Sequence, residues 1–241
     1  QSVEVVVVEL SGASPIVRER WSREAARRLV HPNLTRFVSS GQSGDLFYTA
    51  TDASVDDETL ERWVSRGGPL EPSRAVEVAR DLLAALQHIH DAGLVHRVVS
   101  PMSVLIDGER RLTRLGDLGL ASDPIGVDGG GATASTDVLG DPRYCAPEAR
   151  GRAHTSRSDL YSLGATLAFA LLGRPPFAPG SGERSPVLLE RLAAGDPLRV
   201  LVHALTQPTP EQRPRGAAEA LQLLGVPGSR PSRASTSRAS S

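Results

Sequence analysis

The sequence predicts an α+β protein of two unequal lobes, a small lobe rich in β-strands followed by a larger lobe that is mainly helical. Within the first 51 residues, segments rich in β-branched or aromatic residues at 3–8, 34–38 and 46–51 are typical of strands. Farther along, apolar residues repeat every three or four positions, most regularly over residues 72–90, as in an amphipathic helix. A chain of 241 residues is long enough for two such lobes and a sizeable core.

The composition is that of a soluble globular protein, with 39% hydrophobic and 23% charged residues. The net charge of -1 provides no bulk attraction to nucleic acid, so we expect no nucleic-acid partner. Cys145 is the one cysteine in the chain, which excludes an internal disulfide and favours a reducing compartment. The longest apolar run, residues 160–172, suits a buried helix and is too short to cross a bilayer, so we expect no membrane segment in this chain.

The N-terminal lobe is expected to contain a strand, a helix and two further strands. A serine and a proline are well placed to begin a helix over residues 15–29, and the proline within residues 31–33 should end it. A glycine-rich turn then joins the strands at 34–38 and 46–51. The polar residues 52–57 are expected to form a hinge.

The C-terminal lobe is expected to contain several helices and one β-hairpin. The helices are predicted at residues 58–66, 72–90, 156–172, 188–194, 197–205 and 217–224. Short apolar runs at 104–106 and 112–115 flank a turn at 107–108 and predict the hairpin. Residues 122–137 lack periodicity and predict a mobile loop, whereas residues 227–241 lack apolar anchors and predict a disordered tail.

Five sequence motifs follow one another in this C-terminal lobe. They read LVHRVVSPMSVLI, GDLGLA, GDPRYCAPE, RSDLYSLGATL and EQRPRGAAEAL. In order they resemble the catalytic loop, the metal-binding loop, the A-P-E segment, the buried helix and the late arginine of Hanks-type protein kinases, bacterial Ser/Thr kinases in particular. The resemblance implies a two-lobed protein-kinase-like fold. Residues 1–55 would form a partial N-lobe that begins near the family's third strand, residues 56–226 the C-lobe and residues 227–241 the tail.

The resemblance places the family's catalytic positions on residues that lack the required chemistry. The 27 Lys+Arg residues are all arginines, so the chain contains no lysine. The strand lysine corresponds to Val8, the catalytic aspartate to Val98, the loop lysine to Ser100 and the metal-binding asparagine to Ser103. Phosphoryl transfer depends on charges that position and neutralise the phosphates, and valine can neither accept a proton nor orient a hydroxyl.

Three positions of the implied nucleotide site remain. Glu24 matches the glutamate of the family's helix C, yet without a lysine partner it is equally well a surface charge. Leu105 stands just after the catalytic loop, at a position implied to contact the nucleotide. Asp117 is the remaining metal ligand: a single carboxylate with water could hold Mg²⁺ weakly, and the alternative is a structural turn residue. The implied cofactor is therefore none, or weakly bound ATP with Mg²⁺.

Five other positions match residues that hold the C-lobe of the family together. We expect His96 to pack in the core against a backbone carbonyl and Arg97 to reach an acidic or phosphorylated loop. Asp159 should cap the buried helix and accept N–H bonds from the catalytic loop. Glu148 and Arg213 should form a buried ion pair, which is costly to break from one side.

The retained framework and the missing catalytic set together indicate a pseudokinase that acts as a signalling and protein-binding module. Its expected partner is another kinase or a phosphopeptide-binding module, with Thr133, Ser135 and Thr136 as candidate phosphorylation sites. The alternatives are a weakly active or unconventional ATP-dependent Ser/Thr kinase, with Asp141 as a substitute base, and a decayed gene product. We expect a cytoplasmic location, either free or as the cytoplasmic part of a membrane-anchored protein.

Overall fold

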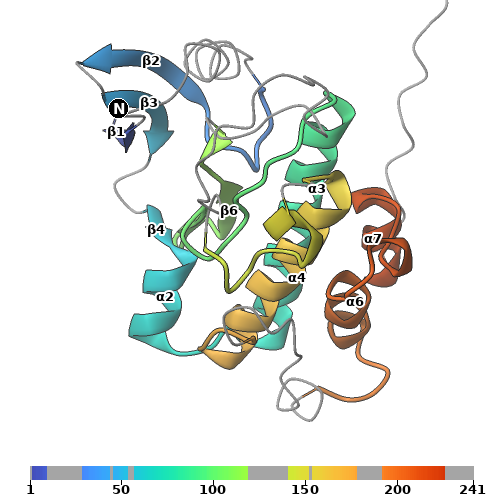
Figure 1. The fold of residues 1–241 in the computed structure, drawn as a ribbon. Coiled ribbons are helices and arrows are strands. Elements are labelled where there is room, and N and C mark those ends of the chain that lie inside the picture. The colour runs from blue at the N-terminus through green and yellow to red at the C-terminus, as the bar shows by residue number, and fades with distance from the viewer. Residues whose placement is uncertain are drawn as a thin grey trace, which may run out of the picture.

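The computed structural model describes residues 2–9, 29–43, 46–53, 57–118, 141–151, 154–177 and 192–225 (Figure 1). The small lobe contains an antiparallel sheet of β1 (Ser2–Glu9), β2 (Phe37–Ser43) and β3 (Leu46–Ala53), in the order β1-β3-β2. The strands predicted at 3–8 and 46–51 are therefore present. The helix predicted at 15–29 lies outside the described residues, except for its last position.

β2 begins three residues later than the strand predicted at 34–38. The residues before it pair with a different sheet, since Leu34 forms a parallel bridge with Leu115. The buried Asn33 reinforces this pairing, because its Nδ2 donates to the carbonyl oxygen of Thr113 at 3.0 Å. The chain thus passes from one sheet to the other just before β2 begins.

A second antiparallel sheet has the order β4-β5-β6 and contains β4 (Asp57–Thr59), β5 (Val104–Asp107) and β6 (Leu112–Leu115). β5 and β6 are the predicted hairpin. β4 was not predicted, because three polar residues carry no strand pattern. α2 (Leu60–Gly67) accordingly begins two residues later than predicted, with the Thr59 hydroxyl as its N-cap. Of the hinge expected at 52–57, Asp52 lies in β3 and Asp57 in β4, and residues 54–56 lie outside the described residues.

Four helices form the centre of the large lobe. They are α3 (Pro72–Asp91), α4 (Ser156–Leu172), α6 (Pro197–Leu205) and α7 (Ala217–Leu223), with short 3-10 turns η2 (Glu148–Gly151) and η3 (Pro210–Gln212). α4 packs against both α3 and α6, and its residues 158–171 are all buried (Figure 1). Because α4 is covered on every side, it lacks the one-sided apolar pattern of a surface helix.

The prediction of a helix at 188–194 is wrong for residues 192–194. Residues 192–194 are not helical, because the chain turns there and Asp196 caps α6, accepting N–H bonds from its first turn. Residues 188–191, the loop at 122–137 and the tail at 227–241 lie outside the described residues. None of the helices in the described part is both long enough and apolar enough to span a membrane.

Candidate functional site

The candidate site is the loop that leads from α3 to β5, which is fixed to the first turn of α4. Asp159 lies in that turn, is fully buried, and accepts N–H bonds from His96 and Arg97, each at 2.8 Å. His90, near the end of α3, places Nε2 2.8 Å from the same carboxylate. Burial alone would raise the pKa of Asp159, but the hydrogen bond from His90 and the charge interactions with both histidines hold it below its ordinary value. The ionised carboxylate therefore joins the loop to two helices.

Asp159 was also expected to cap α4, and this part of the prediction is wrong. Thr155 is the N-cap: its Oγ1 accepts from the Ser158 N–H at 3.3 Å, and Ser158 Oγ accepts from the Thr155 N–H at 2.8 Å. This reciprocal pair is a capping box, which satisfies the helix N-terminus. The Asp159 carboxylate remains available for the loop because the cap does not need it.

His96 joins the loop to the segment that carries Asp117. Its side chain is completely buried, and Nε2 lies 2.7 Å from the carbonyl oxygen of Gly116. The Gly116 N–H in turn donates to the carbonyl oxygen of Ser103 at 2.8 Å. The contact expected between His96 and a backbone carbonyl is present. Gly116 therefore bonds to His96 at the start of the loop and to Ser103 at its end.

Ser103, at the position of the family's metal-binding asparagine, uses its hydroxyl inside the loop. Its Oγ donates to the carbonyl oxygen of Ser100 at 3.1 Å and accepts from the Ser100 N–H at 3.0 Å. Both serines are buried. Val98, at the position of the catalytic aspartate, is only 7% exposed. The loop is therefore well ordered by hydrogen bonds, while Val98 offers no base and the Ser103 hydroxyl is already engaged.

Asp117 lies where its charge is disfavoured. Burial raises the pKa of its carboxyl group, and the interaction with His96 opposes this shift only in part. The backbone of Asp117 is left-handed, with φ 59°, a conformation that aspartate and asparagine tolerate better than most residues. Over the described residues, no three His, Cys, Asp or Glu side chains come together to hold a metal ion.

These residues do not fit ATP with Mg²⁺ as the family would bind it. The phosphate-binding lysine is missing from the whole chain, and Asp117 is the one carboxylate left at the implied metal site. Leu105 is buried in β5, opposite Arg114 of β6. Val8 lies in β1, opposite Phe47 of β3, and Glu24 lies outside the described residues.

Asp141, the alternative base, is already engaged by Arg143. The Arg143 Nε lies 3.0 Å and 2.9 Å from the two carboxylate oxygens, and its backbone N–H donates to Oδ1 at 2.9 Å. Burial would raise the pKa of Asp141, but these bonds and the adjacent guanidinium charge lower it overall. A carboxylate with a lowered pKa is a poor general base, so the geometry does not favour Asp141 in that role.

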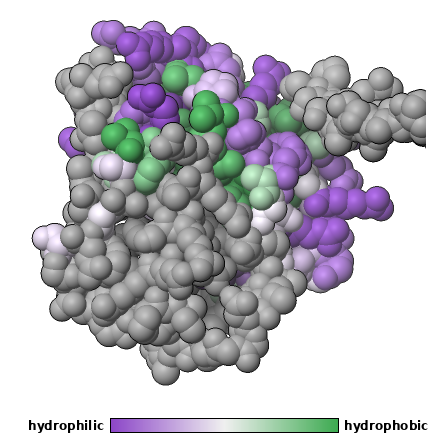
Figure 2. All heavy atoms as spheres, turned by 90° about the horizontal axis from the view of Figure 1, so that it is seen from above, coloured by the Kyte–Doolittle hydropathy of each residue, from purple (hydrophilic) through white to green (hydrophobic). Residues whose placement is uncertain are grey.

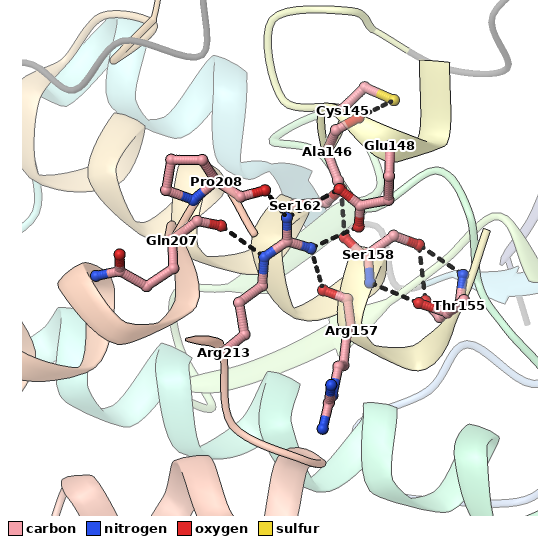
Figure 3. Close-up of polar contacts among 10 residues, drawn as sticks. All are labelled: Cys145, Ala146, Glu148, Thr155, Arg157, Ser158, Ser162, Gln207, Pro208 and Arg213. Atoms are coloured by element: carbon pink, nitrogen blue, oxygen red, sulfur yellow. Dashed lines mark hydrogen bonds and ion pairs between the residues drawn. The ribbon is translucent and has the colours of Figure 1, made fainter. Parts of the chain in front are cut away.

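Glu148 and Arg213 form the expected ion pair beside the first turn of α4 (Figure 3). The pair is bidentate, with Nη1 to Oε1 at 2.6 Å and Nη2 to Oε2 at 2.9 Å. The other N–H groups of the guanidinium donate to backbone carbonyl oxygens, those of Arg157, Gln207 and Pro208. All the donors of a fully buried arginine are thereby used, and the ion pair links η2, α4 and the segment after α6.

Sequence reasoning missed two contributors to the loop. The Ser100–Ser103 bonds could have been found from the spacing, because serines three residues apart beside a proline favour a local hydroxyl-to-backbone turn. The signal for His90 is weaker: it directly follows Ile89, the last buried residue of α3, so it lies at the edge of the buried face. The expected phosphorylation sites Thr133, Ser135 and Thr136 lie outside the described residues.

Exposed hydrophobic side chains are dispersed over the described surface. The large ones are Val30, Val38, Met102 and Val200. They lie before β2, in β2, in the loop and on α6 respectively. On the face in Figure 2, hydrophobic residues are interspersed with hydrophilic ones. Met102, which is 55% exposed, brings an apolar side chain to the surface within the loop itself.

A family model described as "Protein kinase domain" matches residues 8–223 of this chain. The chain is 33% identical over 243 residues to the serine/threonine-protein kinase PkaA of Streptomyces coelicolor, covering 93% of this chain and 44% of that protein. It is 36% identical over 183 residues to the serine/threonine-protein kinase PknB of Mycobacterium tuberculosis, covering 73% of this chain and 29% of that protein. The chain therefore spans less than half the length of these relatives.

Among solved structures, the crystal structure of Rad53 1–466 in complex with AMP-PNP is similar, with a TM-score of 0.71 and 22% sequence identity. The match covers 93% of this chain and 58% of the Rad53 chain. The α+β, protein-kinase-like fold predicted from the sequence is thereby confirmed.

Proposed function

The chain belongs to the protein kinase domain family, and we propose that it is a catalytically inactive member, a pseudokinase that works by binding other proteins. The observation that carries this proposal is the state of the catalytic loop. Val98 replaces the base, and the hydroxyl of Ser103 is engaged by Ser100. The loop is nevertheless fully anchored through Asp159 and His96.

The loop therefore keeps the residues that hold its fold and lacks those that would carry out phosphoryl transfer. Asp159 and His96 position the loop through hydrogen bonds, whereas Val8 and Val98 are apolar and the Ser103 hydroxyl is already bonded to Ser100. Deletion of several members of a catalytic set removes most of the rate enhancement, and what survives comes from positioning alone. A chain without a lysine cannot supply the family's lysine–phosphate contact from a neighbouring position.

The proposed partner is another protein kinase or a phosphopeptide-binding module, in a cytoplasmic setting. Thr133, Ser135 and Thr136 are proposed as sites that a second kinase phosphorylates, since each phosphate would add close to two negative charges. Arg97 is proposed to read this charge, because its backbone is fixed by Asp159 at the start of the loop. If alanine at all three positions leaves partner binding unchanged, the phosphorylation part of the proposal fails.

A weakly active Ser/Thr kinase is the second candidate. It is favoured by the retained Asp117 and by relatives that are named serine/threonine-protein kinases. In this case Asp117 would hold Mg²⁺ on a weakly bound ATP.

The test compares the wild-type chain with Asp117→Asn, which suits the left-handed backbone, and with Asp91→Asn, an exposed control on α3. Thermal unfolding with and without ATP and Mg²⁺ reports binding, since ligand at 100 times its Kd adds about 2.7 kcal/mol. Transfer of labelled phosphate to a generic protein substrate reports activity. We expect no transfer above that of Asp117→Asn. Mg²⁺-dependent transfer that is lost in Asp117→Asn and kept in Asp91→Asn would establish the active kinase instead.

A further inference from the structure

The two sheets of this chain come together beside Asp52 and Asp57. Asp52 lies in β3, in the first sheet, and Asp57 begins β4, in the second sheet. Figure 1 shows the first sheet at the top left, with β4 and β6 beneath it. Arg114 of β6 contacts both carboxylates, so a single guanidinium spans the junction.

Strand register explains how Arg114 reaches this position. In the second sheet Leu105 of β5 stands opposite Thr59 of β4 on one side and Arg114 of β6 on the other. Directly opposed residues share a face of an antiparallel sheet, so the side chains of Arg114 and Leu105 project from the same face of the second sheet. From there its Nη2 contacts Asp57 Oδ2, and its Nη1 lies 3.5 Å from Asp52 Oδ1.

Asp52 extends this link to the start of β2. Its Oδ1 also accepts the Arg36 N–H at 2.5 Å, and its own N–H donates to the Arg36 carbonyl oxygen at 2.8 Å. The Arg36 guanidinium adds a weaker contact, with Nε 3.6 Å from Oδ2. The Asp52 carboxylate therefore connects the crossing segment before β2, the strand β3 and, through Arg114, the second sheet.

The strand β4 depends on this link more than its neighbours do. It has three residues, lies at the edge of its sheet, and places Asp57 directly opposite Asp107 of β5. Both carboxylates are buried, and like charges facing one another across a ladder are destabilising. Asp107 accepts an N–H bond from Arg110 at 2.9 Å, while Arg114 brings positive charge to Asp57.

We propose that Arg114 is an internal ionic latch that holds the two sheets in one relative orientation and keeps β4 paired at the sheet edge. The side chain is 12% exposed and Asp57 4% exposed, so water and salt screen this contact less than they screen a surface pair. Such a latch would join the two sheets whether or not the chain is catalytic.

The test is native-state hydrogen exchange on Arg114→Gln, with Arg111→Gln as the matched control. Arg111 lies in the same hairpin, but its guanidinium is 62% exposed and pairs with Glu77 on α3. We expect peptides covering 36–37, 52–53 and 57–59 to exchange at least about tenfold faster in Arg114→Gln only, a factor that corresponds to about 1.4 kcal/mol. The amides of α4 should keep the wild-type rate. If the junction exchanges no faster than in Arg111→Gln, or if α4 accelerates by the same factor, Arg114 is not a latch.

Two further variants keep the test decisive if Arg114→Gln is too unstable to study. Asp52→Asn, at a site that is 33% exposed, should accelerate exchange at 36–37 while 57–59 stay protected. Asp57→Asn should accelerate 57–59, and Asp57→Asn combined with Arg114→Gln should be no faster than Arg114→Gln alone. Additive effects in the combined variant would show that the two residues act independently, which would overturn the proposal.

Discussion

Replacement of Arg213 by glutamine should remove a large part of the stability of the C-terminal lobe. The arginine makes a bidentate pair with Glu148, donates to three carbonyl oxygens, and lies 4.8 Å from the ring centre of Tyr161. Removing one partner of a buried ion pair costs about 3–5 kcal/mol. The Glu148 side chain is 20% exposed and can be partly rehydrated, so we expect a loss near the lower end, about 3 kcal/mol.

The measurement is the free energy of unfolding from urea titration followed by far-ultraviolet circular dichroism. For a domain of this size each kcal/mol lowers Tm by about 2–4 °C, so a loss of 3 kcal/mol predicts a drop of about 6–12 °C. Arg215→Gln is the matched control, because Arg215 is exposed two residues farther along the chain. Its free energy of unfolding should stay within about 0.5 kcal/mol of wild type.

Two comparisons can refute this reasoning. Arg213→Lys keeps the charge but carries its donors on one nitrogen, so its stability should fall between wild type and Arg213→Gln. Arg213→Gln combined with Glu148→Gln should lose less than the sum of the two single variants, because each single variant leaves an unpaired charge and the combined variant leaves none. A loss in Arg213→Gln no greater than in Arg215→Gln, or strict additivity, would show that the ion pair contributes little.

Three further predictions concern α4 and Asp117. Gly164→Ala should cost about 1–3 kcal/mol, because its Cβ would lie 2.7 Å from Leu205 Cβ, whereas Gly195→Ala has open space and should be near neutral in urea unfolding. Asp159→Asn should lose at least about 3 kcal/mol at pH 7, since each bond to a charged group contributes about 1.5–3 kcal/mol. Because the pKa of Asp159 is lowered, this deficit should be complete above about pH 4 and shrink as pH falls through the folded-state value. Asp117 has a raised pKa, so Asp117→Asn should be more stable than wild type at pH 7, and this gain should disappear below about pH 4 in the same titration.

The elements that the sequence predicts well are those whose patterns arise from burial. α4 is apolar on all sides because it is buried on all sides. In α3 the apolar residues repeat every three or four positions because a single face of the helix is buried. β4 could not be predicted, because it is held by a ladder with β5 and by Arg114, both distant in sequence. For the same reason the start of β2 was placed too early: Leu34 looks like a strand residue and does pair, but with Leu115 of the other sheet.

At the site, sequence comparison with a known family located positions, and only the structure supplied their contacts. The ion pair of Glu148 with Arg213 was predicted, because the family pairs these positions. The contacts of Arg114 were not predicted, because an arginine among the apolar residues of a hairpin strand looks like a surface charge. Only the strand register shows that it lies opposite Leu105. The hydroxyl of Ser103 stands at the position of the family's metal-binding asparagine, and only the structure shows that its hydrogen bonds to Ser100 use both its donor and an acceptor lone pair.

The order of the catalytic loop therefore needs no catalytic residue to explain it. Asp159 holds the start of the loop through two N–H groups, His96 joins it to Gly116, and Ser103 closes its end. These contacts are buried or partly buried, so losing any one would leave a polar group unsatisfied and cost stability. The side chain of Val98 is apolar and buried, so it has no polar group that a hydrogen bond must satisfy. The stability of the fold alone accounts for these anchors, with valine at the position of the family's base. This is why a well-formed loop in this chain is evidence of a folded domain and does not by itself indicate phosphoryl transfer.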